Sequence, residues 1–374
     1  MRAKLLVLAV FVAGLAFGAV PLVTGRGTDF HAYAEAARAL RGGHDPYAGA
    51  DPYLYPPLLA VALVPLTFLP ESAAAWLWMV ASAAALSAAA GRVAKGSERL
   101  LLLALLFAPF AATQWNLQAN AFVLLILVHA REWLDRGSEA RGGALLGLSI
   151  AIKPFGLLAA GALLLVGRWR AGLAAVAVAL LSFAAIVPFT SMTGAIAAGG
   201  AVRRVLSSSR VETYGANISA NGSLDRLMPD GAGVERHRVV GLAIAGGTVL
   251  LLAGAAANAR RAGKRLLPSA VVDAALAATL LGATVSSWLH HSTILFPAVA
   301  SLPSVVQVAA VALYGVAAAW QRFATLGGRS RGHSFPRRNG CPHPRMATRD
   351  QEGGDTLLGL VADSTAEFST RSCG

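Results

Sequence analysis

The sequence of 374 residues has little of what a soluble enzyme normally contains. Only 14% of its residues are charged, whereas 56% are hydrophobic, and this composition is too apolar for a single soluble core under a wetted surface. Its two cysteines, Cys341 and Cys373, both lie in a polar C-terminal stretch. The rest of the chain therefore has neither a disulfide framework nor a thiolate metal site, which argues against redox chemistry.

The chain also lacks strand-like alternation and internal repeats, and its apolar residues fall instead into long blocks. These blocks are long enough to cross about 30 Å of hydrocarbon as helices. We predict an all-α polytopic integral membrane protein, a multi-helix bundle with about 9 to 11 transmembrane helices. The net charge of +13 does not indicate nucleic acid here, because the basic residues lie in short loops between apolar blocks.

The basic clusters predict the topology, since an excess of Lys and Arg is typical of cytoplasmic loops. The first apolar block lacks a small-residue cleavage site, so we expect an uncleaved span and a cytoplasmic N-terminus. Residues 25–57 and 190–237 then form external loops of a multi-pass plasma-membrane protein. The clusters lie at residues 91–99, 131–141, 167–170 and 259–265 and in the tail from Arg322.

Three apolar blocks have interruptions that predict how they fold. The block 58–90 is broken at residues 69–71 and makes one net crossing, while the block 100–130 forms a hairpin whose outer turn is residues 113–120. The block 142–166 is too short for two full spans. Its break at Lys153 predicts two half-length helices that meet around a buried lysine, although a lysine at a helix end can also snorkel to the interface.

The first external loop contains Asp29, followed by apolar residues at helical spacing. That pattern predicts a helix lying in the membrane interface, and Asp is among the residues preferred as a helix N-cap. On sequence alone, a solvated loop is the simpler explanation of the polar turn 113–120. His290 and His291 lack further Asp, Glu or His at ligand spacing, so no metal site is predicted.

The order of motifs resembles glycosyltransferase family 87, the polyprenyl-phosphate-mannose-dependent α-mannosyltransferases of the GT-C superfamily. The resemblance covers about residues 5 to 300 and is carried by their order along one apolar chain. The motifs are GTDFHAYAEAARALRGGHDPY, YLYPPL, QWNLQAN, GGALLGLSIAIKP, RWR, NGSLDRL and SWLHH. The resemblance implies a GT-C-like bundle with its active site at the outer face, a polyprenyl-phosphate sugar as donor, and no nucleotide sugar or other cofactor.

The family's catalytic acid in the first external loop matches Asp29, which becomes the candidate base for the incoming hydroxyl of a glycolipid or polysaccharide acceptor. A lipid-linked donor keeps its phosphate at the interface, where cationic and amide groups can bind it. Lys153, His290 and His291 are the candidate phosphate partners, and Gln114, Asn116 and Asn221 are candidate hydrogen-bond donors to phosphate or sugar. Tyrosines of the first loop either stack on sugar rings or anchor the interface; they are Tyr33, Tyr47, Tyr53 and Tyr55.

The sequence departs from the family at two places. QWN stands where the family has a Gly-Gln-x-Asn turn, which weakens the match of Gln114 and Asn116. The predicted membrane domain, residues 1–320, is followed by a polar tail, residues 321–374, where the family continues with apolar helices. We expect this tail to be disordered and cytoplasmic, and to represent an altered C-terminus.

A multi-span transporter or lipid flippase is the alternative class. It would also be an apolar bundle with rare buried charges, and Lys153 and Asp273 would then be pathway or ion-coupling residues. The absence of a second half that mirrors the first argues against this alternative.

Overall fold

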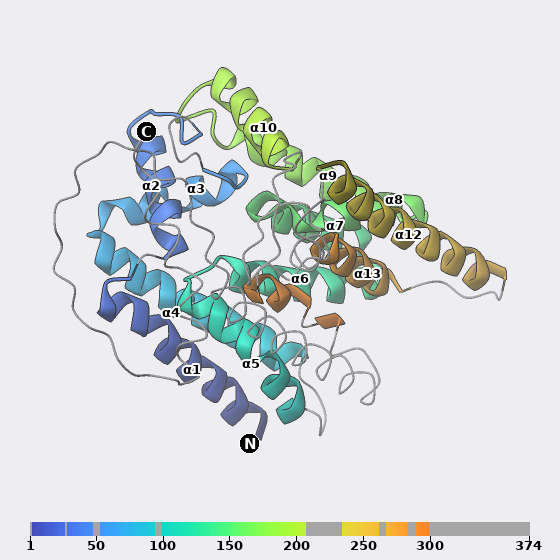
Figure 1. The fold of residues 1–374 in the computed structure, drawn as a ribbon, viewed down its shortest axis with the longest axis horizontal. Coiled ribbons are helices and arrows are strands. Elements are labelled where there is room, and N and C mark those ends of the chain that lie inside the picture. The colour runs from blue at the N-terminus through green and yellow to red at the C-terminus, as the bar shows by residue number, and fades with distance from the viewer. Residues whose placement is uncertain are drawn as a thin grey trace, which may run out of the picture.

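The regular secondary structure is helical throughout the described part of the chain, which confirms the predicted all-α class (Figure 1). The structure is a computed structural model. The residues it describes are 2–26, 28–47, 53–93, 99–206, 234–261, 267–282, 289–295 and 297–298.

The described helices follow this order along the chain. The first six are α1 (Arg2–Thr24), α2 (Asp29–Arg41), α3 (Pro57–Leu63), α4 (Glu71–Val93), α5 (Arg99–Trp115) and α6 (Asn120–Asp135). The others are α7 (Glu139–Ile152), α8 (Leu157–Leu165), α9 (Trp169–Ala184), α10 (Met192–Leu206), α12 (Val234–Arg261) and α13 (Pro268–Leu281). Three 3-10 segments accompany them, namely η1 (Val64–Phe68), η2 (Pro154–Gly156) and η3 (Leu289–Leu295).

Several of these helices have the composition of membrane spans. In the described residues, Val7–Thr24 of α1, Glu71–Val93 of α4 and Val239–Ala257 of α12 are long and apolar enough to cross a bilayer. Shorter apolar helices occur at Pro57–Phe68, Pro154–Leu165, Trp169–Ala184 and Pro268–Leu281. The chain is therefore a membrane-type helical protein.

The three predicted interruptions are all present. The chain leaves η1 and begins a new helix at Glu71, immediately after Pro70, and a turn at residues 116–119 separates α5 from α6 as predicted. Beyond that turn α5 and α6 scarcely contact each other, so they do not pack as the predicted hairpin. The third break separates α7 from α8 at Lys153, whose backbone is extended (φ −143°, ψ 129°) as expected for a residue that precedes proline. Lys153 is 0% exposed, so the prediction of two short helices meeting around a buried lysine is confirmed.

Helix ends next to several of the predicted basic loops come together at one end of the bundle. Helices α1 and α4 run antiparallel, because Gly91 near the end of α4 lies against Val7 near the start of α1. Ion pairs then link the neighbouring helix ends: Arg92 with Glu132 (3.1 Å), Arg168 with Glu139 (2.8 Å) and Arg131 with Asp273 (2.7 Å). The predicted topology requires this clustering.

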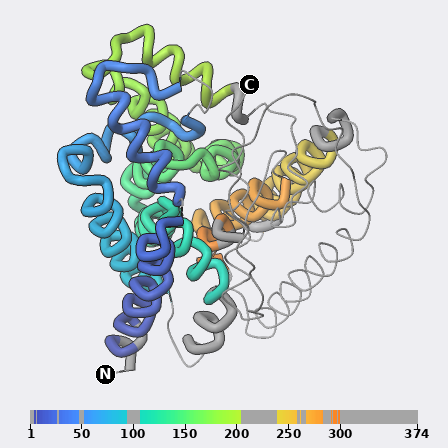
Figure 2. Tube along the Cα trace, turned by 60° about the vertical axis from the view of Figure 1, so that its left-hand side comes forward, coloured from blue at the N-terminus to red at the C-terminus, as the bar shows by residue number. Residues whose placement is uncertain are grey.

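The opposite end of the molecule carries α2, α3 and α10. Both views place these helices far from the N-terminus (Figures 1 and 2). The helix predicted after Asp29 is present as α2. The segment 190–237 was predicted as a connecting loop, but its first part forms α10, because Ala195, Ala198 and Ala201 provide a buried apolar face at helical spacing.

Helices α7 and α9 pack with their backbones in close approach at two glycines. A Cβ added at Gly143 would overlap the carbonyl oxygen of Ala171, and one at Gly147 would overlap that of Ala175. Small residues at such spacing allow apolar helices to pack closely where water does not drive association. This contact holds α7, and with it Lys153 at its C-terminal end, against α9.

The glycine contact gives a stability prediction. Gly143→Ala should lower the free energy of unfolding by about 1 to 3 kcal/mol, because the added methyl group overpacks a rigid backbone contact. Gly161→Ala in α8 is the matched control, since a Cβ there meets nothing within 4 Å and alanine is the better helix former. Thermal unfolding in detergent tests both; equal melting temperatures for the two variants would contradict the packing argument.

Candidate active site

The polar turn between α5 and α6 is the centre of the candidate site. Leu117 adopts a left-handed conformation (φ 48°), and this ends α5 and turns the chain back toward α6. The Trp78 indole of α4 donates a hydrogen bond to the Leu117 carbonyl (2.8 Å), and the Asp29 amide donates to the Asn116 carbonyl (3.1 Å). The turn thus joins α2, α4, α5 and α6.

Gln118 lies in this turn and binds two other segments. Its side-chain oxygen accepts hydrogen bonds from the Tyr33 hydroxyl of α2 (3.0 Å) and from the Lys153 ammonium. Gln118 is itself buried, and its backbone amide donates to the Thr113 carbonyl (2.9 Å). A single amide therefore connects the interfacial helix to the lysine between α7 and α8.

The Lys153 ammonium is surrounded by aromatic rings as well as by Gln118. Its nitrogen lies 4.8 Å from the centre of the Tyr55 ring and 5.8 Å from that of Phe155. A cation over an aromatic face is attracted by the ring quadrupole, and more strongly where water is excluded. The break before Pro154 thus places the Lys153 ammonium among one polar and two aromatic side chains inside an apolar bundle.

Asp29 is the first residue of α2, and the N-cap position belongs to Thr28. The carboxyl is half-buried and lies close enough to Lys153 for their charges to interact. Burial raises the pKa of the Asp29 carboxyl to about 6, and the positive charge of Lys153 acts in the opposite direction. An acid with a pKa near the working pH is suited to proton transfer.

The four tyrosines of the first loop gather into one aromatic cluster. Neighbouring rings lie 5.5 to 5.8 Å apart, in the order Tyr33, Tyr55, Tyr53 and Tyr47. Burial raises the pKa of the Tyr33 and Tyr55 hydroxyls, so both remain protonated and able to donate hydrogen bonds. The Tyr47 hydroxyl donates to the Tyr55 carbonyl (2.8 Å), which fixes the loop around the cluster.

The other predicted polar residues of the turn have local partners. Gln114 donates a hydrogen bond to Ser82 of α4 (2.9 Å), and Asn116 donates to the Ala112 carbonyl of its own helix (2.9 Å). Neither bonds to Lys153 or Tyr33, whereas Gln118 bonds to both. Leu117 has a backbone conformation that glycine adopts far more readily than leucine, and the residues that follow it read Gln118-Ala119-Asn120.

The histidines and Asn221 differ in what the structure describes. His291 is buried in η3, and its ring lies 4.8 Å from that of Phe155, next to Lys153. The backbone of His290 belongs to the same 3-10 segment. Asn221 and the tail 321–374 lie outside the described residues. Within the described part of the chain, no three His, Cys, Asp or Glu side chains are grouped as metal ligands.

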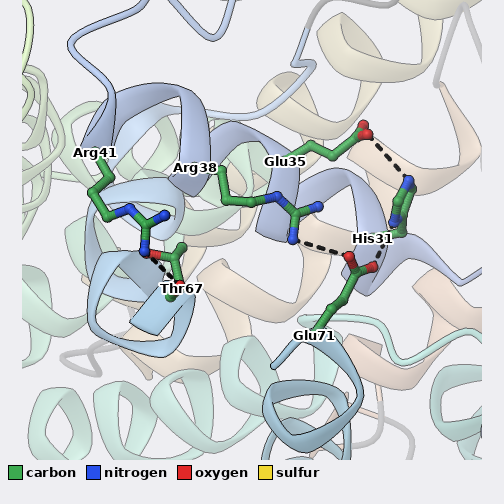
Figure 3. Close-up of polar contacts among 6 residues, drawn as sticks. All are labelled: His31, Glu35, Arg38, Arg41, Thr67 and Glu71. Carbon is green, nitrogen blue, oxygen red and sulfur yellow. Dashed lines mark hydrogen bonds and ion pairs between the residues drawn. The ribbon is translucent and has the colours of Figure 1, made fainter. Parts of the chain in front are cut away.

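Polar contacts on the surface hold α2 to the start of α4. Glu71 binds His31 (2.7 Å) and Arg38 (3.0 Å), and His31 also contacts Glu35 (3.1 Å) (Figure 3). One turn further on, Arg41 donates to the Thr67 carbonyl (2.6 Å). These exposed contacts are individually weak, but together they set the position of the helix that carries Asp29 and Tyr33.

The fold and this cluster define a membrane-type helical protein with an enzyme-like site of one acid, one cation and several phenols at the α2 end of the bundle. A model of glycosyltransferase family 87 matches residues 53–292, and the chain belongs to that family. Lys153 and Gln118 lie within the matched segment, whereas Asp29 precedes it. A search of curated proteins and a search of solved structures found no match.

Proposed function

We propose that the protein transfers a mannosyl residue from a polyprenyl-phosphate donor to a glycolipid or polysaccharide acceptor at the outer face of the membrane. The observation that supports this most strongly is the pair of Asp29 and Lys153, an acid and a cation in one apolar and aromatic setting. The reaction needs these two charges, a base for the incoming hydroxyl and a cation for the phosphate that leaves.

In the proposed reaction the acceptor oxygen attacks the anomeric carbon of the mannosyl group. The bond from that carbon to the phosphate oxygen breaks, the hydroxyl proton passes to the Asp29 carboxylate, and polyprenyl phosphate leaves with the bonding electrons. Attack from the face opposite the phosphate inverts a β-linked donor to an α-linked product. The atoms and electrons of this transfer balance without an oxidant, a reductant or a metal ion.

On the donor side, Lys153 is the proposed phosphate partner, and His291 lies next to it across the Phe155 ring. His290 and Asn221 remain proposed donor ligands on sequence grounds. Gln114 and Asn116 are proposed to act through the shape of the turn, because their amide groups bond to neighbouring helix atoms. The phenols of Tyr33 and Tyr55 both interact with the charge of Asp29, and the Tyr55 ring also lies under the Lys153 ammonium. Both phenols are suited to contact the sugar.

The transporter alternative depends on unpaired charges inside the bundle. Asp273 bonds to Arg131 (2.7 Å) at the end where the basic loops gather, which accounts for it as a contact between α6 and α13. Lys153, the other charge on which this alternative rests, has its ammonium over the Tyr55 ring of the first loop and interacts with the charge of Asp29, an arrangement that favours chemistry at an interface.

The proposed orientation predicts which loops are accessible. Cysteines introduced at Ser97 and Ser138 should resist an impermeant thiol reagent in intact cells, whereas one at Ser208 should react, because basic loops remain cytoplasmic. Permeabilised cells, in which all three should react, provide the control. Reaction at Ser138 without reaction at Ser208 would invert the orientation and with it the outer-face site.

Lys153→Met tests the phosphate partner. Donor affinity should fall by roughly 2 to 5 kcal/mol, as when one partner of a buried hydrogen-bonded charge pair is lost. Lys153 lowers the pKa of Asp29, so loss of its positive charge should raise that pKa. The acid limb of the profile of transfer rate against pH should therefore move to higher pH. Unchanged donor affinity in a variant that folds normally would assign a structural role to the lysine instead.

Asp29→Asn tests the base. Asparagine keeps the size of the side chain but cannot take a proton, so transfer should fall by about 10² to 10⁴ while donor binding and protein yield stay near normal. In the parent, transfer should fall as the pH drops through about 6, because the raised pKa leaves the base protonated below that value. Full transfer by the Asp29→Asn variant would exclude Asp29 as the base. Glu35, Asp45 and Asp51 of the same loop would then be the next candidates for that role.

A further inference from the structure

Asp29 and Lys153 carry opposite charges and influence each other, yet they do not form an ion pair. The ion pairs among the described residues include neither of them. Inside a protein, opposite charges attract more strongly than in water, and a lysine carries its ammonium on a flexible four-carbon stem that can bring it toward a carboxylate. Something must therefore hold the ammonium in its observed place.

The hydrogen bonds to Gln118 identify that restraint. An ammonium group has only donors, so the Gln118 amide must turn its oxygen toward Lys153. The Tyr33 hydroxyl donates to the same oxygen (3.0 Å), which fixes the amide orientation from a second side. The rings of Tyr55 and Phe155 face the remaining sides of the ammonium.

The restraint itself is anchored on rigid backbone. Gln118 follows Leu117, whose left-handed turn is held by the Trp78 hydrogen bond, and Tyr33 is 0% exposed within α2. Because Tyr33 and Asp29 belong to successive turns of one helix, the amide fixes Lys153 relative to the helix that carries the acid. The titratable groups that interact with Asp29 from the packed elements are Lys153, Tyr33 and Tyr55.

We propose that Gln118 and Tyr33 form a restraint that holds the Lys153 ammonium short of a contact ion pair with Asp29. The carboxylate then stays free to accept the proton of the acceptor hydroxyl, and the ammonium stays free to bind the donor phosphate. Both residues are positioning residues, since they act through Lys153. Their assigned purpose rests on the proposed function, but the restraint is a property of the free protein.

The test is a titration of the Asp29 carboxyl by its infrared absorption, taken as the difference between each protein and its Asp29→Asn counterpart. Gln118→Met removes the amide and keeps the length of the side chain. Lys153 should then close on Asp29 and lower the midpoint of the titration by at least about one pH unit, the usual effect of a contacting cation on an aspartate. Tyr33→Phe, which removes a single hydroxyl, should shift the midpoint in the same direction by a smaller amount.

Two controls isolate the restraint. Tyr53→Phe also removes a buried tyrosine hydroxyl, but this one has no hydrogen-bond partner among the described residues, so the midpoint should equal that of the parent. In a Lys153→Met background, Gln118→Met should produce no further downward shift, because the cation that would close on Asp29 is absent.

The outcomes separate this inference from the proposed function. Midpoints that stay at the parent value in both Gln118→Met and Tyr33→Phe, or that rise, would overturn the restraint even if mannosyl transfer by the parent is normal. Downward shifts in a protein that transfers no sugar from a polyprenyl-phosphate donor would uphold the restraint and reject the proposed reaction. If Gln118→Met does not fold, the Tyr33→Phe variant decides alone. A lower midpoint of the Asp29 titration supports the restraint, and an unchanged or higher midpoint overturns it.

Discussion

A lysine ammonium buried in an apolar helical bundle is the constraint on which the rest of the site depends. A buried charge costs several kcal/mol unless hydrogen bonds and neighbouring charges compensate for it. Lys153 is 0% exposed, and its compensation comes from Gln118 in the α5–α6 turn, Tyr55 before α3 and the charge of Asp29 at the start of α2. Segments far apart in the sequence are thus drawn to one point.

Much of the fold could be predicted from the sequence, because prolines and basic loops mark where helices end. Pro154 after Lys153, within a block too short for two spans, predicted the break and the buried side chain. Pro70 likewise predicted the start of α4. Helix α10 was missed because its segment is rich in Ala and Gly, whose small side chains give a weak apolar signal even when they repeat at helical spacing. The pairing of Asp273 with Arg131 could not be predicted either, since it depends on how α6 and α13 pack.

Both charged residues of the candidate site, Asp29 and Lys153, were singled out from the sequence. The amide of Gln118, which bonds to Lys153, was not. Gln114 and Gln118 are four residues apart and would share one face if α5 continued. Leu117 instead takes a positive φ, so Gln114 faces Ser82 while Gln118 faces Lys153. Nothing local in a leucine indicates that conformation, which glycine adopts far more readily. The repeated Gln-x-Asn pattern at 114–116 and 118–120 was the one available signal.

The half-buried Asp29 carboxyl and the buried Lys153 ammonium are proposed to serve transfer from a lipid-linked sugar. The most direct measurement supplies membranes containing the protein with radiolabelled polyprenyl-phosphate-mannose and total lipid acceptors, and in parallel with a radiolabelled nucleotide sugar. We expect a new labelled glycolipid from the polyprenyl donor alone, with its label released by an α-mannosidase. Label transferred from the nucleotide sugar but not from the polyprenyl donor would contradict a lipid-linked donor for this protein.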